Sequence, residues 1–128
     1  MAKILIIDDE SNIRSTLKEI LEYENYEVDE AQDGKEGLEK VQANEYDVVL
    51  CDVRMPKMEG TEVLEKAMEL GKDTQFIMIS AHGTIETAVE ATKKGAFDFI
   101  PKPPDLNRML VSTATLWTKA RLCKKPRS

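Results

Sequence analysis

A short apolar run that ends on a carboxylate organises this sequence, and it reads Asp47-Val48-Val49-Leu50-Cys51-Asp52-Val53-Arg54-Met55-Pro56. Apolar residues entered through an aspartate and left towards a proline are typical of a strand buried on both faces, as in a parallel sheet covered by helices. Such a strand delivers Asp52 to the rim of the sheet. Ligands of open parallel sheets bind beyond the carboxyl ends of the strands, so Asp52 is the first candidate for chemistry. Taken alone, Asp52 could equally be a solvated turn residue.

Strands and helices alternate along the rest of the chain. The expected strands cover residues 3–8, 26–31, 48–52, 76–79 and 96–100. The expected helices begin at or near Ser11, Gly34, Thr61, Thr84 and Asp105. Five such repeats with short connections predict right-handed crossovers and a parallel sheet. The predicted fold is therefore α/β, a doubly wound (βα)5 domain whose five-stranded parallel sheet has the flavodoxin-like order 2-1-3-4-5.

Two helices carry more detailed predictions. Ser11 is expected to cap the first helix, because its hydroxyl can accept a hydrogen bond from a free backbone N–H group. In the helix that Gly95 ends, apolar and small residues at helical spacing predict the inward face. That face consists of Ile85, Ala88, Val89 and Thr92.

Composition indicates one globular domain. The chain has 128 residues, of which 41% are hydrophobic and 33% charged, enough to bury a core without disulfides. Cys51 and Cys123 form no recognisable motif, which favours a reducing, cytoplasmic compartment. The apolar run at residues 4–7 is too short for a signal peptide or a membrane span.

Charge is distributed unevenly. The net charge is −6, and all 24 acidic residues precede position 106. The acidic body should repel nucleic acid. We expect residues 1–122 to form the domain and residues 123–128 to be a basic tail or the start of a linker to a further domain. A solvated linker explains this tail better than a phosphate-binding segment.

Polar side chains follow the strands at one rim of the predicted sheet. In the order 2-1-3-4-5, Asp8 and Asp9 lie beside Asp52, and Ser80 and Lys102 arrive from the last two strands. Crowded carboxylates repel unless a cation lies among them, and Mg²⁺ suits carboxylate and phosphate oxygens. A nucleophilic carboxylate, a metal, a lysine and a hydroxyl are the groups needed for phosphoryl transfer onto aspartate. A solvated acidic turn at Asp8–Glu10 is the plainer alternative.

The sequence resembles a response-regulator receiver domain of two-component signalling over residues 3–120. The shared motifs are Asp8-Asp9, the Asp52-Val53-Arg54-Met55-Pro56 segment, Ser80-Ala81, and Lys102-Pro103. The resemblance implies that the domain is a phosphorylation-activated switch rather than a turnover enzyme. A sensor histidine kinase would donate the phosphoryl group.

The same resemblance assigns roles to individual residues. Asp52 is the phosphoacceptor, and Asp8, Asp9, Asp52 and the backbone carbonyl of Arg54 hold Mg²⁺. Lys102 contacts the phosphoryl group, Ser80 is the switch hydroxyl and Phe99 is the switch aromatic. Phe99 lacks the hydroxyl of tyrosine-bearing relatives. The resemblance also suggests that the Lys102–Pro103 peptide is cis.

Within the family, several segments are similar to the nitrogen-regulatory class, whose receivers usually precede an ATPase domain and a DNA-binding domain. They are residues 52–56, 80–84 and 95–99. Output is then expected through the face formed by residues 84–122, by self-association as a homodimer or by contact with an effector. This would make the chain the regulatory part of a transcription regulator.

Three other functions compete with this interpretation. A Mg²⁺-dependent aspartyl phosphatase usually has Asp-x-Asp after its first strand and a cap domain, and neither is found. A flavin protein is disfavoured because Asp8–Glu10 would repel the flavin phosphate. A degenerate receiver that only dimerises is disfavoured by the complete set of five rim positions. His82, the only histidine, is interpreted as an exposed loop residue.

Overall fold

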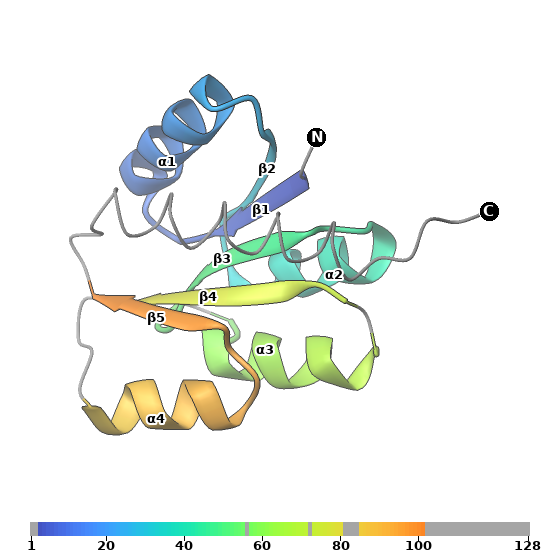
Figure 1. The fold of residues 1–128 in the computed structure, drawn as a ribbon, viewed down its shortest axis with the longest axis vertical. Helices are drawn as coiled ribbons and strands as arrows, with labels where there is room; N and C mark the ends of the chain where they lie inside the picture. The colour runs from blue at the N-terminus through green and yellow to red at the C-terminus, as the bar shows by residue number, and fades with distance from the viewer. Residues whose placement is uncertain (1–2, 56, 72, 81–84, 102–128) are drawn as a thin grey trace.

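The computed structural model describes residues 3–55, 57–71, 73–80 and 85–101 (Figure 1). Its strands are β1 (Lys3–Ile7), β2 (Glu27–Ala31), β3 (Val48–Asp52), β4 (Gln75–Ser80) and β5 (Asp98–Pro101). Its helices are α1 (Ser11–Tyr23), α2 (Gly34–Ala43), α3 (Gly60–Glu69) and α4 (Ile85–Lys93). The predicted last helix, from Asp105, lies outside the described residues. None of the helices in these ranges is long and apolar enough to cross a membrane.

The sheet confirms the predicted fold. Its strands are parallel and follow the order β2-β1-β3-β4-β5. Strands β1 and β3 are direct neighbours, with Ile7 paired to Cys51. The carboxyl ends of these two central strands therefore reach the same rim.

Strand β3 is buried along its whole length, as the apolar run predicted. Its side chains alternate between two cores. Val49 and Cys51 belong to the core that contains residues of α2, α3 and α4, whereas Val48 and Leu50 belong to the core that contains residues of α1. Figure 1 shows the same division, with α1 on one face of the sheet and α3 and α4 on the other. Helices on both faces explain why the strand carries no polar alternation.

The prediction that Ser11 caps α1 is wrong. Ser11 is the first helical residue, and the N-cap is Glu10, whose backbone is extended and whose side chain makes no capping hydrogen bond. The turn before the helix is held instead by Asp8, whose Oδ1 accepts a hydrogen bond from the Glu10 N–H at 2.8 Å. The first turn is thus organised by an acid of the candidate site.

The predicted inward face of α4 is wrong at Val89 and Thr92, whereas Ala88 is half-buried and the side chain of Ile85 lies outside the described part. Val89 is 46% exposed and Thr92 is exposed, whereas Ala91 is fully buried. Residues two positions apart in a helix, such as Val89 and Ala91, lie roughly 200° apart around its axis. Burial of Ala91 therefore turns Val89 to solvent. Small Ala91 permits close approach to the core, and Lys94 pairs with Glu65 of α3 at 2.9 Å, which favours this rotation.

Candidate functional site

Three acidic side chains cluster directly after β1. One carboxylate oxygen from each of Asp8, Asp9 and Glu10 lies within 4.8 Å of the other two. Asp8 is buried, whereas Asp9 and Glu10 are exposed. Asp8 and Asp9 were predicted here. Glu10 was noted only as part of the acidic turn, and its place in the cluster depends on the extended backbone that precedes α1.

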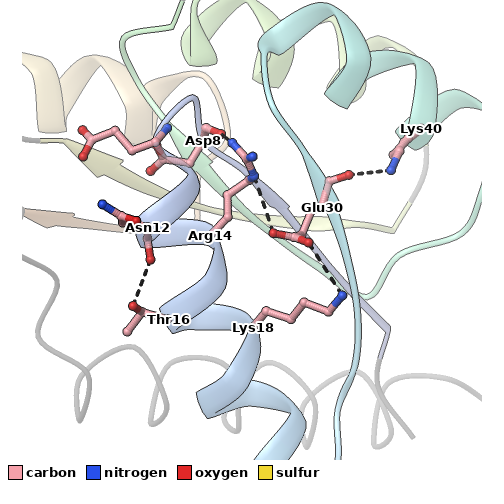
Figure 2. A network of polar contacts seen from close by, with 8 residues as sticks. Asp8, Asn12, Arg14, Thr16, Lys18, Glu30 and Lys40 are labelled. Carbon is pink, nitrogen blue, oxygen red and sulfur yellow. Dashed lines mark hydrogen bonds and ion pairs between the residues drawn. The ribbon is translucent and has the colours of Figure 1, made fainter.

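The backbone and side chain of Asp8 are held by separate contacts. Its N–H donates to the Ala31 carbonyl at 3.1 Å, which extends the pairing of β1 with β2. Its carbonyl accepts a hydrogen bond of 2.6 Å from Nη1 of Arg14, shown in Figure 2. Together with the Glu10 amide on Oδ1, these contacts fix the direction in which the buried carboxylate leaves β1.

Asp52 ends the neighbouring strand β3 and is only 5% exposed. Because Ile7 and Cys51 are register partners, the residues that follow them, Asp8 and Asp52, emerge side by side at the rim. Burial raises the pKa of the Cys51 thiol well above its usual value, and the negative charges of Asp52 and then Asp8 raise it further. Two buried carboxylates from different strands thus act on one thiol.

The first residue of helix α3, Gly60, packs against the backbone of Asp52. The Gly60 N–H donates to the Val53 carbonyl at 2.8 Å. A Cβ atom on Gly60 would lie 2.0 Å from the carbonyl oxygen of Asp52. Glycine is therefore required for this close approach of the helix to the strand end. The sequence predicted a helix from about Thr61 and gave no reason to expect this contact of Gly60.

The loop after Asp52 is also held by the turn before α2. Asp33 caps α2 by accepting the Glu36 N–H at 2.8 Å, and it pairs with Lys57 at 3.5 Å. These interactions lower the pKa of the Asp33 carboxyl: the Glu36 hydrogen bond is the largest cause, burial opposes it, and Lys57 lowers the pKa by a smaller amount. Gly34 packs so tightly that a Cβ atom would lie 2.1 Å from the Met58 carbonyl oxygen.

The remaining predicted residues are distributed around this rim or lie beyond the described part. Ser80 ends β4, is buried, and is paired in register with Pro101 of β5. Phe99 on β5 is half-buried and packs against the core. Arg54 is exposed. Lys102, the Lys102–Pro103 peptide and most of the expected output face, residues 84–122, fall outside the described residues.

The donor set fits a hard divalent cation. The clustered ligand atoms of Asp8, Asp9 and Glu10 are all carboxylate oxygens, the donors that Mg²⁺ prefers, and two of these residues are open to water. Mg²⁺ retains several waters when bound, so partial exposure of the cluster suits it. The arrangement can therefore place a cation, with its shell of water or phosphate oxygens, beside the strand end that carries Asp52.

Comparisons with known proteins agree with this geometry. The family described as "Response regulator receiver domain" matches residues 4–114. The chain is 33% identical to the transcriptional regulatory protein ZraR of Klebsiella oxytoca over 96% of its length and 28% of that protein. It is 39% identical to the response regulator ArlR of Staphylococcus saprophyticus over 86% of its length and 50% of that protein. The chain thus spans a half or less of these relatives.

A solved structure gives the same result for the fold. A response regulator receiver domain protein from Methanospirillum hungatei superposes with a TM-score of 0.88 at 35% identity, covering 94% of this chain and 98% of that one. The similarity to ZraR is consistent with the nitrogen-regulatory class suggested by the motifs.

Proposed function

This chain belongs to the response-regulator receiver domains, and on that premise we propose that Asp52 is the residue that accepts the phosphoryl group. In the transfer, a carboxylate oxygen of Asp52 forms a bond to phosphorus. The bond from phosphorus to the donor breaks, and its electron pair leaves with the imidazole nitrogen of a kinase histidine, or with acetate when acetyl phosphate is the donor. Water later hydrolyses the acyl phosphate, which releases inorganic phosphate and returns the free carboxylate.

One observation carries this proposal. Asp52 ends β3 and Asp8 directly follows the adjacent β1, both are buried, and the charges of both raise the pKa of the same Cys51 thiol. Buried like charges at such close quarters are costly unless a cation compensates them. The two carboxylates lie at the rim of the parallel sheet where ligands bind. Their position therefore supports a cation and phosphoryl site around Asp52.

Magnesium is the cation that we propose. Asp8 and Asp9, with Asp52 and the backbone carbonyl of Arg54, would hold it, and Glu10 lies within the same cluster. When bound, Mg²⁺ neutralises the carboxylates and the phosphate oxygens that must approach them. Asp52 supplies the nucleophile, while Asp8 and Asp9 provide the negative charge that attracts the cation.

We further propose that Lys102 contacts the phosphoryl group and that Ser80 and Phe99 carry the switch. Ser80 ends β4 beside β3, which supports a role close to Asp52. Phosphorylation shifts an equilibrium between two states by its differential interaction with them. The output passes through residues 84–122, to a second copy of the chain or to an effector domain.

The biological setting follows the family. A sensor histidine kinase is the proposed donor, the cytoplasm is the proposed compartment, and control of transcription is the proposed output. The acidic net charge of −6 supports a domain that does not bind nucleic acid itself. Catalysis of its own phosphorylation and dephosphorylation is part of the proposal, with no external substrate turned over.

Labelling with acetyl phosphate tests the assignment. Intact-mass measurement should find one phosphoryl adduct on the wild-type chain in Mg²⁺, and none in Asp52→Ala or in excess chelator. The matched control is Asp73→Asn, which neutralises an exposed aspartate in the connection before β4, at the opposite rim. An adduct that persists in Asp52→Ala, or that forms equally well in chelator, disproves the proposal.

A further inference from the structure

Arg14 links the acidic cluster to the edge of the sheet. It lies in the first turn of α1, its side chain is only 16% exposed, and its guanidinium has two partners. Nη1 donates to the Asp8 carbonyl at 2.6 Å, and Nε lies 3.5 Å from a carboxylate oxygen of Glu30 on β2. Figure 2 shows the side chain reaching between these two groups. One residue of α1 thus connects the end of β1 with strand β2.

Glu30 is itself fixed from two directions. Its carboxylate also pairs with Lys18 at 3.6 Å, and its backbone carbonyl accepts a hydrogen bond from Lys40 of α2. Figure 2 shows Lys18 and Lys40 approaching Glu30 from different helices. The guanidinium of Arg14 is therefore held at one end by a group that has little freedom to move. A planar guanidinium held in this way offers its remaining N–H groups in a fixed direction.

That direction leads to Asp8. Three of the contacts that hold Asp8 involve Ala31, Glu10 and Arg14: the first two are made by backbone N–H groups, and the third is made by a side chain. Side-chain substitution can remove the Arg14 contact without altering the backbone. Lysine carries the same charge but presents a point charge on a flexible stem, so it cannot reproduce the two contacts together.

Charge and geometry predict opposite effects of Arg14 on a cation site. A positive side chain near a divalent cation repels it, so removing Arg14 should strengthen binding if charge is all that matters. Loss of a group that holds a ligand in place should weaken binding, and partners that orient metal ligands typically contribute roughly 10- to 100-fold in affinity. The sign of the effect separates the two roles.

We propose that Arg14, clamped by Glu30, is a positioning residue that holds Asp8 in the direction needed for the cation site. This inference rests on the proposed binding of Mg²⁺ at Asp8 and Asp9. Arg14 touches neither the cation nor the phosphoryl group in this proposal. It acts through the backbone of Asp8.

Calorimetric titration of the full chain with Mg²⁺ tests the proposal. Arg14→Lys and Arg14→Gln should both lose about tenfold in affinity, although only the second removes the charge. The matched control is Lys66→Gln, which removes an exposed positive charge from α3 and, in the described residues, has no contact with Asp8, Arg14 or Glu30. Its affinity should stay within about twofold of wild type, because an exposed charge is largely screened.

A second readout needs no metal. The Glu10 amide donates to Asp8 Oδ1, so its NMR chemical shift and hydrogen exchange report the orientation of Asp8 directly. In metal-free Arg14→Lys, exchange of this amide should accelerate while amides of β3 keep their protection. Glu30→Gln weakens the ion pair with Arg14 while leaving the residues Arg14 and Asp8 themselves unchanged. It should accelerate exchange of the Glu10 amide by a smaller amount. It carries the test if substitution of Arg14 prevents folding.

The outcomes separate the two levels of the argument. Wild-type affinity in Arg14→Lys, or tighter binding in Arg14→Gln, overturns the positioning role while leaving the proposed function intact. A wild-type chain that does not bind Mg²⁺ overturns the proposed function. In that event the Glu10 amide still decides whether Arg14 positions Asp8, since an unchanged amide in both Arg14→Lys and Glu30→Gln refutes it.

Discussion

The two ends of the sheet treat their polar groups in opposite ways. At the amino end, each polar group considered has a complementary partner. The Lys3 N–H donates to the Asp47 carboxylate at 2.8 Å, and the buried Thr74 hydroxyl donates to the Tyr46 carbonyl at 2.7 Å. Lysine and tyrosine also stack, with the Lys3 ammonium 5.2 Å from the Tyr46 ring centre. Such pairing stabilises the fold.

At the carboxyl end, charges of the same sign gather instead. One carboxylate oxygen from each of Asp8, Asp9 and Glu10 lies within 4.8 Å of the other two, and the buried Asp52 lies beside Asp8. The amino end thus pairs complementary groups, whereas the carboxyl end gathers carboxylates, the donors that the proposed cation would bind. Substitutions at the two ends should therefore differ in sign as well as in size.

The largest effect is expected at the carboxyl end, from Gly60→Ala. A Cβ atom there would meet the backbone carbonyl of Asp52 at 2.0 Å, and backbone cannot move aside as a side chain can. We expect a loss of about 3 kcal/mol in the free energy of unfolding, together with slower labelling of Asp52. Urea unfolding and the rate of acetyl phosphate labelling measure the two effects.

Gly71→Ala is the control for Gly60→Ala. Gly71 has a positive φ of 69° but no atom within 4 Å of its Cβ position. Only the left-handed backbone is then penalised, at about 1 kcal/mol, and the rate of labelling should not change. If both substitutions destabilise equally and leave labelling alone, the contact of α3 with Asp52 has no bearing on the site.

An intermediate effect, confined to stability, is expected at the amino end from Thr74→Val. The valine keeps the shape of the buried side chain but leaves the Tyr46 carbonyl without its donor, which should cost about 1.5 kcal/mol. Mg²⁺ affinity should be unchanged, since Thr74 precedes β4 at the far rim. Thr92→Val is the control, because the Thr92 hydroxyl is exposed and bonds only within its own helix. A change in Mg²⁺ affinity in Thr74→Val would contradict the separation of the two ends.

The sequence could predict part of this difference between the two ends of the sheet. It could predict where strands end, but not how the helices contact those strand ends. The strand ends at Asp8, Asp52 and Ser80 were predictable, because apolar runs mark the strands and short connections set their order. The contacts of Arg14 and Gly60 were not, since they depend on how a helix is oriented relative to the strand end that precedes it, which the apolar pattern does not specify. The same dependence explains the wrong face of α4, where Ala91 rather than Val89 is buried.

A smaller effect of opposite sign is expected from Asp9→Asn. Removing one charge from the cluster relieves repulsion, so the metal-free protein should gain about 0.5 kcal/mol in stability, a small value because Asp9 is exposed. Added Mg²⁺ should raise the melting temperature of wild type but not of this variant. Asp47→Ala is the counterpart at the amino end and should destabilise the protein, because it removes the acceptor of the Lys3 N–H. Equal signs for the two substitutions would remove the distinction between the ends.

The smallest effect concerns pH and lies at the carboxyl end, at Asp33, in the turn that follows β2. Its pKa is lowered in the folded protein, chiefly by the Glu36 amide and less by Lys57. A lowered folded pKa means that the contribution of the carboxylate to stability is present above the unfolded pKa of about 4 and is lost as pH falls through the lower folded value.

Asp33→Asn keeps a capping side chain but cannot titrate. The difference in unfolding free energy between wild type and Asp33→Asn should thus be constant near neutral pH and shrink below about pH 4. Lys57→Gln should show a weaker form of the same pH dependence, because the capping hydrogen bond, rather than the exposed lysine, is the larger cause.

Urea unfolding of the three proteins from about pH 7 down to about pH 3 measures these differences in unfolding free energy. Parallel stability curves for wild type and Asp33→Asn over that range would mean that the Asp33 carboxylate is no better stabilised in the folded chain than in water, and that the turn before α2 holds the loop after Asp52 through the contact of Gly34 with Met58 alone.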